Sequence, residues 1–406
     1  MRKAFLAMNN PSGRVLGTVF SLIGCGALFW PGLAPAAPRI LFVARGESAN
    51  NTYELYTMSA DGTDRRRVTT NTVSEWAPAL APDNYRVAYV RDDLASSNLF
   101  ITSIDGMPPV RVSNANAALC VQWADNHTLF FLSRTQPDSG SQSTFRLWRI
   151  GTDGSGGALV FTNTFSDWSM GARAFSVRRE TGTVYLSADV PGGSYESMIR
   201  FGAIGSLSPT GTVSTSSSYL DHYGPVVSPD GSQIAFCVDP QGSGGQHRLY
   251  VTGMGGGPGI RLSDVYCGNP SWSPDGAWLA FTRATSSTYG ASPYVGDIWR
   301  VSARGTNLLA LTTNSPVAAK CAFPTVFEPP EITLAPPQVD PNEVVIIWSG
   351  GANLLHTLQS ATNCASGSWT AVPGAVDLAS TGATLTVTDE VAPAGPRFYR
   401  VVARPQ

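Results

Sequence analysis

Short apolar segments separated by Gly, Pro and Asp turns recur along most of the chain. In the clearest copies, residues 224–236 and 269–281, one apolar segment precedes Ser-Pro-Asp-Gly and another follows it. A third copy, residues 77–89, has Asn84 in place of Gly, and weaker copies lie at 122–131 and 174–186. Pro presets φ, Asp bonds the nearby backbone, and Gly or Asn accepts a positive φ. Each copy therefore predicts a β-hairpin, with Asp83, Asp230 and Asp275 as turn formers.

Two further strand-like segments follow each hairpin, separated by a Gly turn. The turn glycines from Gly62 to Gly305 are spaced by 44 to 57 residues and leave five intervals. Four antiparallel strands repeating at such a period predict a β-propeller blade, so the chain predicts six blades. The first unit lacks an inner strand, and residues 320–327 look like an inner strand without a unit. We expect them to close the ring beside residues 40–43, which removes an open sheet edge. A seventh unit within 163–218 is the alternative.

The repeats resemble those of the TolB-like, WD-repeat-like β-propeller family. The resemblance rests on Pro-x-Trp-Ser-Pro-Asp-Gly followed by an apolar triplet, and it covers about residues 40–327. It implies an all-β, six-bladed ring in the periplasm or outside the cell, used as a protein-binding platform, and it implies no shared chemistry. TolB carries an α/β domain ahead of its propeller, whereas only a signal-like segment precedes residue 40, so that protein's envelope role does not transfer.

The predicted propeller spans residues 38–327 and is followed by a Pro-rich linker at 328–342. Five strand-like segments between residues 344 and 401 then predict a small β-sandwich within 343–406. This segment resembles the fibronectin type III-like modules of secreted bacterial proteins, which implies attachment or spacing, with glycan binding as a weaker option.

The N-terminal segment predicts export. Residues 1–37 combine basic residues, an apolar stretch and small residues around Ala36, as in a signal peptide. Residues 22–25 resemble a lipobox, which makes a lipoprotein anchored at Cys25 the alternative. Without residues 1–36 the chain has 24 basic and 29 acidic residues, a net charge of −5. That balance argues against nucleic-acid binding, and we expect no transmembrane span after processing.

Composition and the absence of known motifs exclude several fold classes and several types of active site. With 41 Gly, 29 Pro and 14% charged residues, the chain is not a helical bundle, a coiled coil or an acidic disordered tail. It contains no Gly-x-Ser-x-Gly elbow, His-Glu-x-x-His, phosphate loop, dinucleotide fingerprint or Cys-x-x-Cys pair. We therefore expect no cofactor and no metal site, and the sequence leans away from an enzyme without excluding one.

One end of the ring is the predicted binding site. In this family's topology, the residues entering each inner strand share a face with the loops between second and third strands, which is where scaffolds usually carry function. The predicted binding residues on this channel-mouth face are Glu75, Trp76, Asp167, Trp168, Asp221, His222, Tyr223, Asn269 and Lys320. Packing between blades is the favoured interpretation of Trp76 and Trp168, and bonds to loop backbone are the favoured interpretation of Asp221 and His222; ligand contact is the alternative for all four. Cys267 and Cys321 hold similar positions in adjacent blades and predict a possible disulfide.

These features favour a secreted or periplasmic, non-enzymatic scaffold that binds a protein or peptide partner. The alternative is a carbohydrate-binding or carbohydrate-active propeller that uses aromatic and acidic residues at the channel mouth. A divalent ion near Asp167 and Asp221 is a further hypothesis. The sequence leaves the oligomeric state and the identity of the partner open.

Overall fold

The computed structural model describes residues 15–16, 20–22, 38–45, 52–93, 96–116, 118–135, 142–166, 175–178, 181–189, 197–203, 211–213, 220–240, 247–257, 259–263, 267–283, 296–312, 321–329, 333–334, 338–340, 343–349, 354–361, 369–380, 384–390 and 397–405. Every regular element in these ranges is a β-strand. None of them is a helix of the length and apolarity that a membrane crossing needs.

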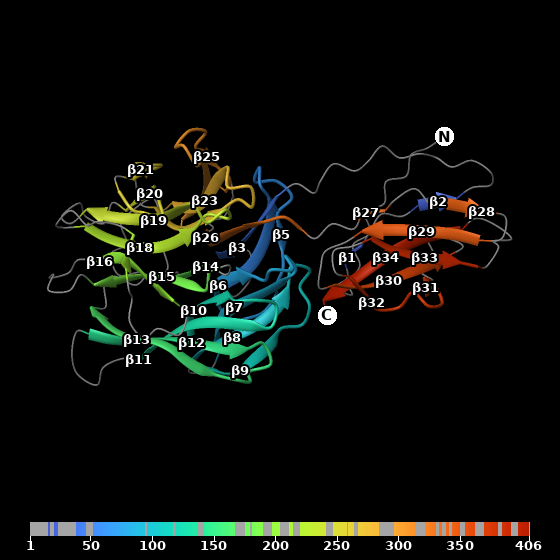
Figure 1. The fold of residues 1–406 in the computed structure, drawn as a ribbon, viewed down its shortest axis with the longest axis horizontal. Helices are drawn as coiled ribbons and strands as arrows, with labels where there is room; N and C mark the ends of the chain where they lie inside the picture. The colour runs from blue at the N-terminus through green and yellow to red at the C-terminus, as the bar shows by residue number, and fades with distance from the viewer. Residues whose placement is uncertain are drawn as a thin grey trace.

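The described part of residues 39–327 forms six four-stranded antiparallel sheets, numbered here 1 to 6 (Figure 1). Sheet 1 contains β26 (Cys321–Phe327), β3 (Arg39–Arg45), β4 (Tyr53–Ser59) and β5 (Arg66–Arg67); sheet 2 contains β6 (Glu75–Leu80), β7 (Arg86–Asp93), β8 (Ser96–Ser103) and β9 (Val110–Asn116); sheet 3 contains β10 (Ala118–Trp123), β11 (Thr128–Thr135), β12 (Gln142–Gly151) and β13 (Ala158–Ser166). Sheet 4 contains β14 (Phe175–Arg178), β15 (Thr183–Asp189), β16 (Ser197–Ala203) and β17 (Gly211–Thr212); sheet 5 contains β18 (Leu220–Val227), β19 (Gln233–Pro240), β20 (Arg248–Gly253) and β21 (Ile260–Arg261); sheet 6 contains β22 (Cys267–Trp272), β23 (Trp278–Arg283), β24 (Asp297–Ser302) and β25 (Leu309–Ala310).

The sheets follow one another around a ring, and the last strand of the ring joins the first sheet. Each sheet contacts the next, and β22 and β23 of sheet 6 contact β26 of sheet 1. In sheet 1, β26 pairs with β3, and Ala322 lies opposite Val43 and Thr325 opposite Leu41. The predicted pairing of residues 320–327 with the strand around Phe42 is therefore confirmed for the described residues 321–327.

The inner strands of four sheets carry a bulge at an X-Pro step. The register shifts between Trp76 and Ala79, and again at the equivalent places in sheets 5, 6 and 1. In sheets 2, 5 and 6 the residue before Pro has a positive φ: Ala77 at 46°, Gly224 at 62° and Asn269 at 51°. The bulge takes the Pro out of the hydrogen-bonding ladder, which lets an inner strand contain a residue without an N–H donor.

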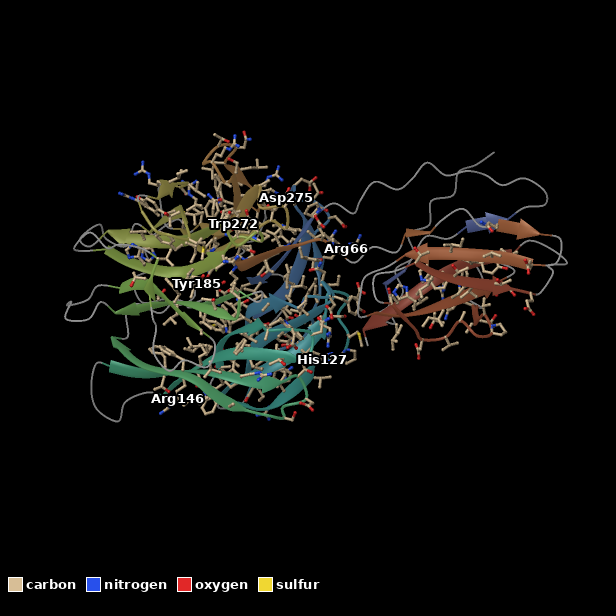
Figure 2. All side chains as sticks on the ribbon, in the orientation of Figure 1. Arg66, His127, Arg146, Tyr185, Trp272 and Asp275 are labelled. Atoms are coloured by element: carbon tan, nitrogen blue, oxygen red, sulfur yellow. The ribbon has the colours of Figure 1, made fainter. Side chains whose placement is uncertain are left out.

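Repeating contacts hold neighbouring sheets and neighbouring strands together. The indole Nε1 of Trp123 in sheet 3 donates to the carbonyl of Ala79 in sheet 2, at 2.9 Å. Trp272 of sheet 6 makes the same bond to Val226 of sheet 5, at 3.0 Å (Figure 2). Aromatic residues of the second and third strands face each other in five sheets, with ring centroids 5.7 to 6.4 Å apart. Such cross-strand pairs stabilise each sheet beyond simple burial.

The hairpin turns have the predicted chemistry. Asp83 Oδ1 accepts hydrogen bonds from the backbone N–H groups of Tyr85 and Arg86, at 2.8 and 2.9 Å. Asp230 and Asp275 accept from the backbone two residues ahead and from the preceding Ser. The bonds from Ser228 and Ser232 lower the pKa of Asp230 to about 2. All three carboxylates therefore form turns, as predicted.

The C-terminal residues form two further sheets beside the ring (Figure 1). One contains β27 (Thr333–Leu334), β28 (Gln338–Asp340), β29 (Glu343–Ser349) and β33 (Thr384–Asp389); the other contains β30 (Leu354–Ala361), β31 (Thr370–Ala371), β32 (Leu378–Ser380) and β34 (Arg397–Pro405), to which β1 (Val15–Leu16) and β2 (Phe20–Leu22) add. Buried residues of both sheets share one core, and Trp348 Nε1 donates across it to His356 Nδ1 at 2.9 Å. The strands β1 and β2 lie within the segment expected to be a signal peptide.

Candidate functional site

One end of the ring collects the starts of the inner strands and the ends of the second strands. In sheet 2 the first residue of the inner strand, Glu75, pairs with Arg91 near the end of β7. The same register joins Leu220 to Pro240 in sheet 5 and Cys267 to Arg283 in sheet 6. We call this end, where the inner strands begin and the second strands end, the mouth face.

Glu75 is buried at the mouth face, in the joint between sheets 1 and 2. Its Oε1 accepts a hydrogen bond from Asn71 Nδ2 at 2.7 Å, and its Oε2 accepts from Thr69 Oγ1 and from the backbone N–H of Leu55. Burial raises the pKa of Glu75 from 4.5 to about 7, although the bonds from Thr69 and Asn71 act in the opposite direction. A carboxyl group that titrates near neutral pH thus lies between two sheets.

A second buried carboxylate, Glu54 of β4, lies next to Glu75. Asn71 connects the two, because its backbone N–H donates to Glu54 Oε1 at 3.1 Å while its side chain donates to Glu75. Arg67 of β5 pairs with Glu54 Oε1 at 3.0 Å, and the charge of Glu54 contributes to the raised pKa of Glu75. Arg67 therefore pairs with Glu54 and not with Glu75.

Aromatic and charged side chains cover this joint at the mouth face. The rings of Tyr53 and Trp76 are in contact with their centroids 4.1 Å apart and their planes tilted by 40°, and the Arg45 guanidinium lies 5.7 Å from the Tyr53 centroid. Trp76 Nε1 donates to Asp92 Oδ2 at 3.1 Å. Arg45 and Trp76 are half-buried, and Asp92 is exposed. We call Arg45, Tyr53, Trp76 and Asp92 the aromatic cluster; it presents an aromatic surface flanked by one positive and one negative charge.

Two other predicted site residues are buried in their own sheets. His222 in β18 is 3% exposed, and its ring lies 5.4 Å from that of Phe236. Asn269 is the residue of positive φ before Pro270, and it is 8% exposed. Its Nδ2 has no hydrogen-bond partner among the described residues. Both residues therefore lie beneath the mouth face, in sheets other than the one that carries Glu75 and Trp76.

The remaining predicted site residues are only partly described. Asp167, Trp168 and Lys320 lie outside the described residues. Asp221 and Tyr223 belong to β18, opposite Asp239 and Cys237, and only their backbone is described. Among the described residues, no three His, Cys, Asp or Glu side chains converge as a metal site requires.

The predicted Cys267–Cys321 disulfide is not formed. Cys267 carries a fully buried thiol that forms no disulfide, and its Sγ donates to Ser263 Oγ at 3.0 Å. It packs in one apolar cluster with Cys237 and Leu249 of sheet 5. The side chain thus faces the preceding sheet, whereas Cys321 lies in sheet 1, which follows sheet 6 around the ring.

A cavity of about 280 Å³ lies on the ring axis, a feature that the sequence reasoning missed. It is lined by equivalent, uncharged residues from the six sheets, Ala79, Gln122, Ser176, Val226, Ser271 and Thr325. Ser271 Oγ accepts from the N–H of Val326 at 3.2 Å, and Thr325 Oγ1 donates to Pro78 O at 3.3 Å. These hydroxyls hold adjacent sheets together. The signal in the sequence was the position after Pro in four of the six repeats, which supplies Ala79, Val226, Ser271 and Thr325.

Comparisons with known proteins support the fold. No protein-family model matches the chain, and no curated protein matches it in sequence. The crystal structure of TolB from Acinetobacter baumannii is similar at 15% identity and a TM-score of 0.55, covering 73% of this chain and 68% of that one. A nidogen/laminin complex is similar at 11% identity and a TM-score of 0.51, covering 71% of this chain and 98% of that one. The chain therefore has a TolB-like β-propeller fold.

Proposed function

We propose that this chain is a non-enzymatic binding scaffold whose mouth face holds a protein or peptide partner. The aromatic cluster is the observation that carries the proposal. Trp, Tyr and Arg are enriched among the residues that dominate binding energy at protein interfaces, and Tyr53 contacts both Trp76 and Arg45 in the cluster. A rigid ring below the cluster reduces the entropy lost on binding.

The proposal includes an export route and an architecture. Residues 1–37 act as a signal, so that the chain works in the periplasm or outside the cell. Residues 38–327 form a closed, six-bladed ring, which is supported by six four-stranded sheets in the described residues and by the pairing of β26 with β3. Residues 343–406 form a fibronectin type III-like sandwich that serves as attachment or spacer, supported by two sheets around one core.

A carbohydrate ligand is the second candidate. A half-buried Trp76 beside the exposed carboxylate of Asp92 also offers a sugar one apolar face and one acceptor. Both candidates use the aromatic cluster, so the chemistry of the ligand has to distinguish them.

Replacing Trp76 by alanine should weaken binding of a selected peptide about 30-fold, because a central Trp contributes about 2 kcal/mol or more at an interface. Peptides would be selected from a display library on the purified chain, and their dissociation constants measured by calorimetry. Trp278→Ala is the matched control: Trp278 is also half-buried and lies beneath an Arg guanidinium, but it follows the hairpin turn at the opposite end of its sheet.

The outcomes separate the two candidates. Peptide binding that is lost in Trp76→Ala and kept in Trp278→Ala supports a peptide partner. Binding on a glycan array with the same dependence favours the carbohydrate ligand. Polysaccharide turnover that disappears in His222→Ala would overturn the non-enzymatic proposal.

A further inference from the structure

Strand β13 is unlike the other outer strands of the ring. In sheets 1, 4, 5 and 6 the outer strand has two residues, and in sheet 2 it has seven, including Arg111. In sheet 3 it has nine residues, from Ala158 to Ser166. No strand within the described residues pairs with the free edge of β13. Short or charged outer strands discourage edge-to-edge pairing, and β13 has neither feature.

The sequence of β13 is uncharged and, in its second half, palindromic. Its nine residues, Ala-Leu-Val-Phe-Thr-Asn-Thr-Phe-Ser, contain no Pro and no ionisable side chain. Residues 161–165 read Phe-Thr-Asn-Thr-Phe in both directions, with Asn163 at the centre. The only irregularity of the strand lies before Phe161, because Leu147 pairs with Phe161 and Trp148 with Leu159. Residues 161–166 then run without a register shift.

We propose that a second copy of this chain pairs with β13 in antiparallel orientation, with the two-fold axis at Asn163. In this register Asn163 faces Asn163 of the second copy, Thr162 faces Thr164, and Phe161 faces Phe165. The contact is isologous, since the same strand is used by both copies. It joins the two outer edges into one continuous sheet and gives partners to the edge backbone groups of β13 that pair with no other described strand.

The second copy is the partner that the strand itself specifies. A palindrome gives matched pairs only when it meets its own sequence in the opposite direction, and Thr–Thr pairs are favourable across strands. The absence of charge removes the like-charge repulsion that otherwise arises when a strand meets its own copy. Thr162 is exposed, so its side chain is free to meet that of a facing residue.

The purified chain should sediment as a dimer whose fraction rises with concentration, and substitutions at facing positions should control that fraction. Thr162→Lys with Thr164→Lys puts like charges opposite each other twice, and should raise the dissociation constant of the dimer about ten-fold or more. Thr162→Lys with Thr164→Glu puts opposite charges at the same positions and should retain the dimer. A general structural effect of the substitutions would affect both variants alike.

A cross-link tests the register separately. Asn163→Cys should form a disulfide-linked dimer on mild oxidation, because facing Cα atoms lie about 4.5–5.5 Å apart, within disulfide range. Ala158→Cys, exposed on the same strand, should not, because its counterpart lies about 33 Å away along the strand. A wild-type chain that stays monomeric up to about 100 μM, or a dimer that persists in Thr162→Lys/Thr164→Lys, would overturn the proposal.

Discussion

Replacing Trp123 by alanine should lower the free energy of unfolding by about 3–5 kcal/mol, the range observed when a buried Trp is truncated. Trp123 is 1% exposed, and Arg86 of sheet 2 lies over its ring with the guanidinium carbon 5.3 Å from the centroid. Its Nε1 also donates to Ala79 O in sheet 2. The substitution therefore opens a cavity and leaves a buried carbonyl unpaired in the joint between sheets 2 and 3.

Two variants separate the causes of this loss, with urea unfolding as the measurement. Trp123→Phe keeps most of the volume and removes the bond to Ala79, so it should cost about 1–2 kcal/mol. Trp148→Ala removes a half-buried Trp whose Nε1 donates to Ser133 within sheet 3, so it should cost less than Trp123→Ala. Equal losses for Trp123→Ala and Trp148→Ala would contradict the idea that contacts between sheets stabilise the ring.

The stability of the chain should fall as the pH rises from 5 to 8, because of Glu75. The folded pKa of Glu75 is about 7 and its ordinary value is 4.5, so the native state holds a proton that the unfolded state has already released. Stability is independent of this group below pH 4.5, decreases between the two pKa values, and is lower by about 3 kcal/mol above pH 7. Ionisation there places a negative charge in a buried position beside Glu54, whose charge further raises the pKa of Glu75.

Glu75→Gln should remove this pH dependence. The amide is neutral at every pH and can still accept a hydrogen bond from Asn71, so the variant should match the wild type at pH 5 and exceed its free energy of unfolding by up to about 3 kcal/mol at pH 8. Glu328→Gln, at an exposed position, should leave the pH profile unchanged. Parallel wild-type and Glu75→Gln profiles between pH 5 and 8 would refute the role of Glu75.

The fold could be predicted from the sequence because the residues that shape each repeat act on backbone close to them in the chain. Asp83, Asp230 and Asp275 bond backbone within three residues, so their role follows from the sequence around them. Closure was also predictable, since the first unit lacked one strand and residues 321–327 supplied it. Both inferences need only the pattern of one unit and the requirement that sheet edges are paired.

The site was less predictable because burial depends on the neighbouring sheet. The sequence placed Glu75 at the correct end of β6, but its enclosure by Thr69, Asn71 and Leu55 comes from residues of the preceding unit. His222 was expected at the mouth, whereas it packs on Phe236 within its own sheet. Cys267 was expected to bond forward to sheet 1, and its side chain instead packs backward against sheet 5. Equivalent positions in two repeats do not reveal which neighbour a side chain contacts.

Closure of the ring through β26 is tested most directly by a cross-link between Ala44 and Cys321, which lie opposite each other in β3 and β26. Facing Cα atoms in antiparallel strands lie within disulfide range. In Ala44→Cys, peptide mapping without reductant should find residue 44 linked to Cys321, and the link should be absent from Ala44→Cys/Cys321→Ser. Free thiols at both positions would contradict the closed ring.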